Sequence, residues 1–236
     1  MNVDRLAKTS AIVIALSTPS VIAAFWPLYL SKSFSTIDRY SHLHAIVGSL
    51  WLLVLILQPL AIHNRWYRMH ITIGKLSYVL APLFVIAGML LSHNRLIGMT
   101  DEKFEIEGFA HYLPFYASLV FGAAYALGLW YRQYEDAHGR FMLLTAIPLI
   151  DPVIGRLLFF YLPELPSPWF YQGITFTLAT IVAGLLVFSY RGKGPPKRAL
   201  VGYFVFLVAL EIGWFTVSLT SQWKQIMHMY RGLPLT

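Results

Sequence analysis

The chain has no cysteine among its 236 residues. Disulfides, thiolate nucleophiles and zinc or iron–sulfur sites held by cysteine are therefore excluded. Charged side chains are also scarce, since Asp, Glu, Lys and Arg make up 12% of the sequence while hydrophobic residues make up 57%. Soluble domains carry a charged fraction of about 25%. This composition indicates an integral membrane protein rather than a soluble one.

Seven apolar runs have the length of roughly 20 residues that a helix needs to cross the hydrocarbon core of a bilayer. The connections between them are short, so successive helices are expected to pack antiparallel. We therefore predict an all-α fold, a polytopic helix bundle that forms one transmembrane domain over residues 1–236. The predicted spans are Ala11–Leu30, Ser41–Ala61, Ile71–Ser92, His111–Tyr131, Phe141–Tyr161, Phe170–Tyr190 and Ala199–Thr220.

The net charge of +7 is interpreted as a topology signal and not as a sign of nucleic-acid binding. The basic residues stand in short loops between apolar runs, where Lys and Arg mark the cytoplasmic side. Eleven of them belong to the side of the N-terminus and six to the other side, while Arg156 lies inside the fifth span. This bias predicts a cytoplasmic N-terminus and a C-terminus outside, with the loop Thr100–Gly108 also outside. The expected location is a bacterial inner membrane, with the lipid bilayer as the first partner and no nucleic acid.

Histidine stands near the start of four successive spans, and these starts alternate between the two faces of the membrane. His44 and His111 therefore share the outer level, while His70 and His138 share the inner level. Neutral imidazoles on facing helices can bind a haem iron from both sides. The pattern suits two b-type haems stacked across a core bundle of residues 41–161, which comprises the second to fifth spans.

Glycine follows two of these histidines at a distance of four residues, giving His44-Ala-Ile-Val-Gly48 and His70-Ile-Thr-Ile-Gly74. Residues four apart share one face of a helix, so each glycine would leave room for a flat macrocycle beside the backbone. A second interpretation stays open. Polar aromatic side chains suit membrane interfaces, and small residues serve ordinary helix packing.

The alternating histidines resemble those of the ascorbate-reducible, di-haem transmembrane cytochromes b, which usually have one span fewer than the number expected for this chain. The resemblance covers about Ser41–Tyr161 and rests on topology and spacing. It implies that His44 and His111 hold an outer haem and that His70 and His138 hold an inner one. It also implies that electrons cross the membrane from a donor to an acceptor.

A second resemblance involves the stretch His138-Gly-Arg140-Phe-Met142 together with the two His-x-x-x-Gly motifs. These features are similar to those of bacterial polytopic membrane proteins of unassigned function, and this likeness implies no activity.

The first resemblance, to the di-haem cytochromes b, implies a redox partner, namely a quinone, another small reductant or a second membrane protein.

Ionisable residues inside the spans are candidate functional groups, because charge is costly in lipid. Asp151 in the fifth span is expected to relay protons or bind metal, or else to join helices as a protonated acid. Arg156 lies 18 residues after His138, which places both on one face if the helix is continuous. It would pair with an outer haem propionate or an anionic headgroup, or else reach the interface by snorkelling. The role of Glu211 in the seventh span stays open.

Three functions compete, and a transmembrane electron carrier is the leading hypothesis. The alternative is a metal-dependent intramembrane hydrolase, with His44, His93 and His111 holding zinc or another divalent metal and Asp151 or Glu211 as the base. Zinc with three protein ligands and a water generates hydroxide near neutral pH. The third hypothesis is a non-enzymatic membrane subunit or assembly factor.

Overall fold

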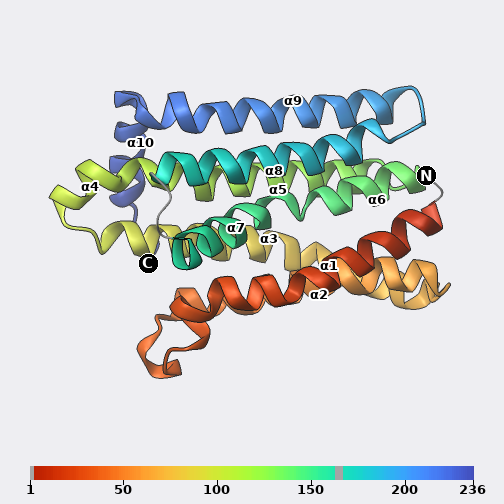
Figure 1. Ribbon diagram of the computed structural model, residues 1–236, viewed down its shortest axis with the longest axis horizontal. Helices are drawn as coiled ribbons and strands as arrows, with labels where there is room; N and C mark the ends of the chain where they lie inside the picture. The colour runs from red at the N-terminus through yellow and green to blue at the C-terminus, as the bar shows by residue number, and fades with distance from the viewer. Residues whose placement is uncertain (1–2, 163–166) are drawn as a thin grey trace.

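The computed structural model describes residues 3–162 and 167–236 and is an all-α bundle (Figure 1). Within this part of the chain, seven helices are long and apolar enough to cross a membrane, which confirms the predicted number of spans. Each predicted span overlaps one of these helices. They cover Asp4–Leu30, Arg39–His63, Tyr67–Ile97, Asp101–Trp130, Glu135–Tyr161, Trp169–Phe188 and Pro195–Leu219.

Most spans are built on a single α-helix, but the fourth combines α4 with α5 and the fifth combines α6 with α7. The α-helices are α1 (Val3–Phe25), α2 (Arg39–His63), α3 (Tyr67–Ile97), α4 (Asp101–Glu107), α5 (Tyr112–Trp130), α6 (Glu135–Leu144), α7 (Ile147–Tyr161), α8 (Pro168–Phe188), α9 (Pro195–Thr216) and α10 (Ser221–Arg231). A π-helical turn, η1 (Trp26–Leu30), extends α1, and the 3-10 turns are η2 (Phe34–Thr36), η3 (Gly108–His111) and η4 (Val217–Leu219).

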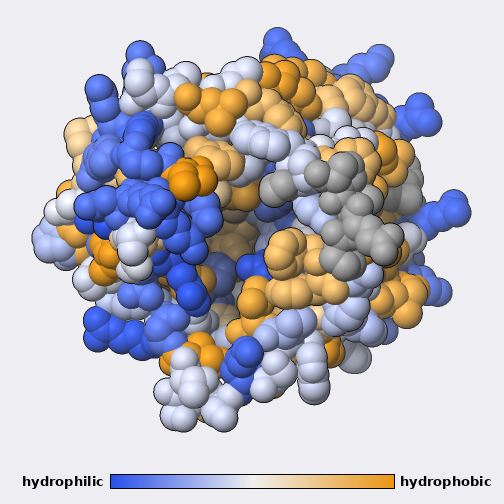
Figure 2. Space-filling view, turned by 60° about the vertical axis from the view of Figure 1, so that its left-hand side comes forward, coloured by the Kyte–Doolittle hydropathy of each residue, from blue (hydrophilic) through white to orange (hydrophobic). Residues whose placement is uncertain are grey.

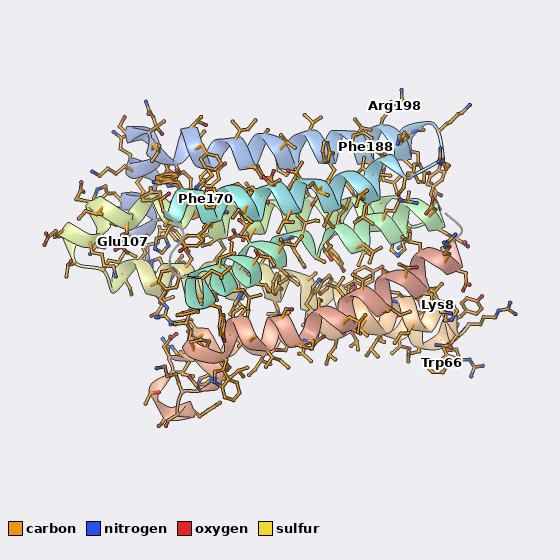
Figure 3. The ribbon with its side chains drawn as sticks, in the orientation of Figure 1. Lys8, Trp66, Glu107, Phe170, Phe188 and Arg198 are labelled. Atoms are coloured by element: carbon orange, nitrogen blue, oxygen red, sulfur yellow. The ribbon has the colours of Figure 1, made fainter. Side chains whose placement is uncertain are left out.

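The spans run back and forth between two ends of the bundle, and the two chain termini lie at opposite ends (Figure 1). The N-terminal end holds the start of α1 and the connections α2–α3, α5–α6 and α8–α9. Figure 3 shows Lys8, Trp66 and Arg198 at this end and Glu107 at the other. The C-terminal end holds α4 and α10. The alternation of the helix starts, on which the predicted histidine levels depend, is therefore present in the fold.

The fifth span is not one continuous helix, so the condition on which the alignment of Arg156 with His138 was predicted is not met. A turn that includes Thr145 separates α6 from α7. Pro148 lies in the first turn of α7, and a proline there has no backbone N–H to continue a helix from before it. Because the helix is interrupted between the two residues, counting regular turns does not give their relative positions.

The segment Thr100–Gly108, predicted as an outer loop, is mostly helical and forms α4. The Thr100 side chain caps this helix by accepting the backbone N–H of Lys103. A Ser or Thr oxygen at this position satisfies one of the free N–H groups at a helix start. The acidic residues of this segment follow the cap directly, which places Asp101 and Glu102 in the first turn, where negative charge stabilises a helix.

Helix α10 lies beside α4 at the C-terminal end, and the hydropathy pattern did not predict it because it is short and amphipathic. Ion pairs join the two helices, from Arg231 to Asp101 at 2.8 Å and from Lys224 to Glu105. α10 thereby covers this end of the bundle. Its buried residues are Trp223, Met227 and Tyr230.

Buried side chains form two clusters. The larger one draws on α5, α6, α8, α9 and α10 and includes Tyr116, Phe141 and Leu207. The smaller one joins α2, α3 and α5 around Trp51 and Phe121. The sixth and seventh spans, which lie outside the core bundle predicted over residues 41–161, therefore supply much of the larger cluster. Many Leu, Ile and Val side chains stay exposed on the outside of the helices, as a surface in contact with lipid requires.

Candidate functional site

The inner pair of histidines meets at the N-terminal end of the bundle. His70 on α3 and His138 on α6 have ring centroids 6.5 Å apart, with the ring planes at 89°. Nδ1 of His138 lies 2.8 Å from the backbone oxygen of Gly128. Since a carbonyl only accepts, this Nδ1 carries a hydrogen, and in the neutral ring Nε2 is then the nitrogen with the lone pair. Nδ1 of His70 is buried and has no partner.

Gln58 of α2 completes the surroundings of His70. Its Nε2 donates to the backbone oxygen of His70 at 3.1 Å, while its Oε1 is buried without a partner. The same Nε2 lies 3.6 Å from the place that a Cβ would take at Gly74. The room beside Gly74, which the sequence pattern assigned to a macrocycle, is therefore filled by the Gln58 amide.

His44 belongs to α2, in the other half of the bundle, and its ring lies against α3. Its ring stacks on Phe84, with centroids 5.4 Å apart, and its Nδ1 is buried without a partner. A Cβ at Gly88 would lie 3.4 Å from the Cε1 of His44, and a Cβ at Gly48 would lie 3.4 Å from the Phe84 ring. Gly88 is thus the glycine that lets α3 approach His44, and the space beside Gly48 is taken by Phe84.

His111 is buried in η3, and its Nδ1 lies 2.9 Å from Oγ of Ser92. Ser92 follows Gly88 by one helical turn, so His111 and His44 approach neighbouring turns on one face of α3. Within the described chain, the ring contact of His44 is with Phe84 and not with His111. Figure 2 brings the C-terminal end of the bundle forward. The face that it shows is hollowed near its middle, with hydrophilic residues beside the hollow.

His93, the third candidate ligand at the outer level, faces the C-terminal segment. Its Nδ1 lies 2.6 Å from Oγ1 of Thr236, and its ring meets Tyr230 edge-on at 5.1 Å. Over residues 3–162 and 167–236, no three His, Asp or Glu side chains lie close enough to hold one metal ion. The geometry therefore gives no support to a three-histidine zinc site, whereas a haem site with two ligands needs no such group.

Asp151 of α7 hydrogen-bonds to α8. Its Oδ1 accepts from Nε2 of Gln172 at 2.6 Å and from Oγ1 of Thr175 at 2.8 Å. Buried acids are tolerated in lipid when they are hydrogen-bonded or paired. These contacts make Asp151 a link between two spans, which is one of the two roles expected for it.

Arg156 points toward α1 and α2. Its Nη1 donates to the backbone oxygen of Pro152 at 2.8 Å, and its guanidinium stacks over the ring of Phe25 at 4.5 Å. The guanidinium also lies within electrostatic range of His44 and Asp151. Arg156 is therefore a cation in the half of the bundle that holds His44.

The start of α2 is tied to α3 by Asp38. The carboxylate accepts the backbone N–H groups of Tyr40 and Ser41, and Arg95 lies 3.3 Å from it. Partial burial opposes its charge, but the hydrogen bonds from Ser41 and the Arg95 guanidinium outweigh that effect. They hold the pKa of Asp38 below its usual value. This anchor fixes the helix turn that carries His44.

Arg140 was counted as a loop cation, yet its side chain is 0% exposed. Its Nε donates to Asp136 at 3.0 Å, and its Nη1 donates to the backbone oxygen of Leu186 at 2.5 Å and to Oγ of Ser189 at 2.6 Å. The spacing of Asp136 and Arg140 by four residues was the one available signal, since such pairs meet on a helix. The partners on α8 lie more than forty residues away in sequence.

No protein-family model, no curated protein and no solved structure matches this chain. The resemblance to the di-haem transmembrane cytochromes b therefore stays a prediction, and the function has to be argued from the geometry of the site.

Proposed function

We propose that this protein is a haem-binding electron carrier of the membrane, in which His70 and His138 would hold a haem at the N-terminal end. The supporting observation is that the two rings come from different helices with centroids 6.5 Å apart. Two imidazoles bonded at about 2 Å to opposite sides of one metal ion have ring centroids about 6 Å apart. The spacing of the rings thus suits one iron between them.

The hydrogen bonds of the pair support the same assignment. A ligating histidine usually donates its other ring N–H to a carbonyl or carboxylate, and His138 donates in this way to Gly128. Nδ1 of His70, on the facing ring, is buried and has no hydrogen-bond partner among the described residues. A bound haem would supply one-electron oxidation and reduction, while these residues would hold it, orient it and shield it from water.

Room for the macrocycle has to come from Gln58. Its amide fills the place beside Gly74 and is held by a hydrogen bond to the backbone of His70, while its Oε1 has no partner. Rotation of this side chain gives up that hydrogen bond, worth about 1 kcal/mol, and opens the face of α3 from His70 to Gly74. A flat ligand would then meet Gly74 in place of the Gln58 amide.

A second haem, held by His44 and His111, is the further part of the proposal. His44 offers a buried Nδ1, and the contact of His111 with Ser92 orients its ring. Arg156, within electrostatic range of His44, would pair with an anionic propionate. Phe84 would have to turn away from Gly48 to admit the group, as Gln58 would at the other end.

An absorption spectrum of the purified protein tests the function. We expect Soret and alpha bands after reduction with dithionite, and we expect His70→Ala and His138→Ala each to lose the haem of the N-terminal end, about half of the total if both sites fill. His63→Ala is the matched control, because His63 lies at the same end, where it pairs with Asp4, and should keep the full spectrum. A reduced wild-type protein without these bands, or one that contains zinc without iron, would rule out the proposal.

We also propose that the N-terminal end faces the cytoplasm and that the membrane is the inner membrane of a bacterium. Eleven Lys and Arg residues belong to this end and six to the other, and this bias marks the cytoplasmic side. The loop between α8 and α9 contributes Arg191 and Lys193, and the first turn of α9 adds Lys197 and Arg198. Electrons would then pass between a cytoplasmic and an outer partner, with a quinone, a small reductant or another membrane protein as candidates.

Single cysteines test this orientation, since the chain has none of its own. We expect a membrane-impermeant maleimide, added to intact cells, to label Glu107→Cys and not Lys193→Cys. Both side chains are exposed, and they lie at opposite ends of the bundle. After the membrane is permeabilised, both variants should be labelled to the same extent. Labelling of Lys193→Cys alone in intact cells would reverse the orientation.

A further inference from the structure

A groove between α8 and α9 has an acid at its base. It has a volume of about 330 Å³, and its lining includes Gly173, Phe176 and Thr180 from α8 and Glu211 and Phe215 from α9. The two helices lie side by side at one edge of the bundle (Figure 1). Phe215 is 41% exposed on the outer surface, whereas Glu211 is only 5% exposed. The groove therefore leads from the lipid-facing surface to a buried carboxyl group.

The carboxyl group of Glu211 has hydroxyl neighbours and no basic one. Oε1 accepts from the hydroxyl of Tyr116 at 3.3 Å, and Oε2 accepts from Oγ1 of Thr180 at 2.5 Å. Among the residues that the structure describes, no Lys, Arg or His forms an ion pair with it. In a low-dielectric setting such a carboxyl group is either protonated or paired with a positive charge, because hydroxyl groups alone do not balance a carboxylate.

The nearby charges do not balance either. Asp151 lies within electrostatic range of Glu211, and Arg156 lies within range of Asp151. In the part of the chain that the structure describes, Asp151 therefore has a cation within range, and no ion pair forms at Glu211. An ionised Glu211 would lack a balancing positive charge, and it is the acid that lines the groove.

The side chains that line the groove favour a ligand with a cationic head and an apolar body. The rings of Phe176 and Phe215 meet edge to face with centroids 6.1 Å apart, and aromatic rings attract cations through their electron-rich faces. A Cβ added at Gly173 would meet no atom within 4 Å, so this part of the groove is open. The remaining lining is largely apolar, which suits the body of a hydrophobic molecule.

We propose that this groove binds a lipophilic cation, an ammonium or related onium group on a hydrocarbon or aryl body, which enters from the hydrocarbon phase and pairs with Glu211. The site is separate from the histidines, so it does not depend on the haem assignment. The ligand brings the positive charge that pairs with Glu211, and the groove provides aromatic walls for the cationic head and an apolar bed for the body.

Equilibrium dialysis with tetraphenylphosphonium tests the proposal on the purified full chain in lipid nanodiscs. We expect saturable binding to the wild type and at least about tenfold weaker binding to Glu211→Gln, which keeps the shape of the side chain but lacks its charge. Equal binding to both proteins, or only unsaturable partitioning that is the same for every variant, would overturn the proposal. The second result is the one expected if a proton alone neutralises Glu211.

A matched pair of glycine variants separates groove filling from general damage. Gly173→Leu fills the open part of the groove and should abolish saturable binding. Gly202→Leu places the same side chain on α9 at a position where a Cβ also meets no atom within 4 Å, and this residue does not line the groove. It should bind as the wild type does. If the two leucine variants bind equally well, the groove is not the binding site.

Discussion

Arg140→Ala should be one of the most destabilising single substitutions in this chain, lowering the free energy of unfolding by about 3–5 kcal/mol. The arginine is fully buried and joins α6 to the end of α8 through Leu186 and Ser189. Its loss leaves the Asp136 carboxylate, whose side chain is 26% exposed, without its cation. It also removes the hydrogen bonds that tie α6 to the backbone oxygen of Leu186 and to the Ser189 hydroxyl at the end of α8, and hydrogen bonds from a charged group are each worth about 1.5–3 kcal/mol. Unfolding in detergent micelles, followed by tryptophan fluorescence, measures the change.

Two further variants identify the cause of that loss. Arg132→Ala removes an exposed arginine at the same end, where its Nη1 donates to the Tyr78 hydroxyl at 3.4 Å, and should change stability by less than about 0.5 kcal/mol. The double variant Asp136→Asn with Arg140→Met removes both charges and fills the volume, so it should regain part of the lost stability. If Arg140→Ala lowers the free energy of unfolding no more than Arg132→Ala does, then the hydrogen bonds of Arg140 do not stabilise the fold.

The location of Arg140 shows one limit of prediction from sequence. Counting Lys and Arg by side treats each as a solvated loop charge, and the count assigned Arg140 to the correct end of the bundle. Nothing in the local sequence indicated its burial, because the acceptors at Leu186 and Ser189 belong to a helix two connections further along the chain. Partners that meet only through tertiary packing leave no local pattern.

The number of spans and the meeting of His70 with His138 were predictable for the opposite reason. Span length follows directly from bilayer thickness, and antiparallel neighbours with short connections must bring alternate helix starts to the same end. The same reasoning placed His44 and His111 in one half of the bundle. It did not show that His111 contacts Ser92 or that Phe84 lies beside Gly48, because both depend on how α3 is rotated.

The interruption of the fifth span shows a third kind of limit. Proline at position 148 was visible in the sequence, but an apolar run of sufficient length was enough to predict a continuous helix. The break depends on partners as well as on proline. Oγ1 of Thr145 donates to the backbone oxygen of Met142 at 2.6 Å and accepts a hydrogen bond from Trp51 at 3.2 Å. A tryptophan from the second span therefore stabilises a turn in the fifth.

Trp51→Ala should accordingly lower the free energy of unfolding by about 3–5 kcal/mol, the range for removing a large buried aromatic side chain. Trp51 is 0% exposed and meets the rings of Phe121 and Tyr125 edge-on at 4.9 and 5.7 Å. Trp51→Phe keeps an aromatic ring and gives up the indole N–H, so its loss should be smaller. The same fluorescence-monitored unfolding compares the two, using the six tryptophans that remain of seven.

A double-mutant cycle then isolates the link between the second span and the break in the fifth. Trp51→Phe and Thr145→Val each remove one side of the hydrogen bond, so their combined loss should fall short of the sum of the single losses by about 0.5–1.5 kcal/mol. Strictly additive losses would show that the indole N–H and the threonine hydroxyl do not interact. The turn between α6 and α7 would then depend on Pro148 and local sequence alone, and Trp51 would serve only to fill the space between α2, α3 and α5.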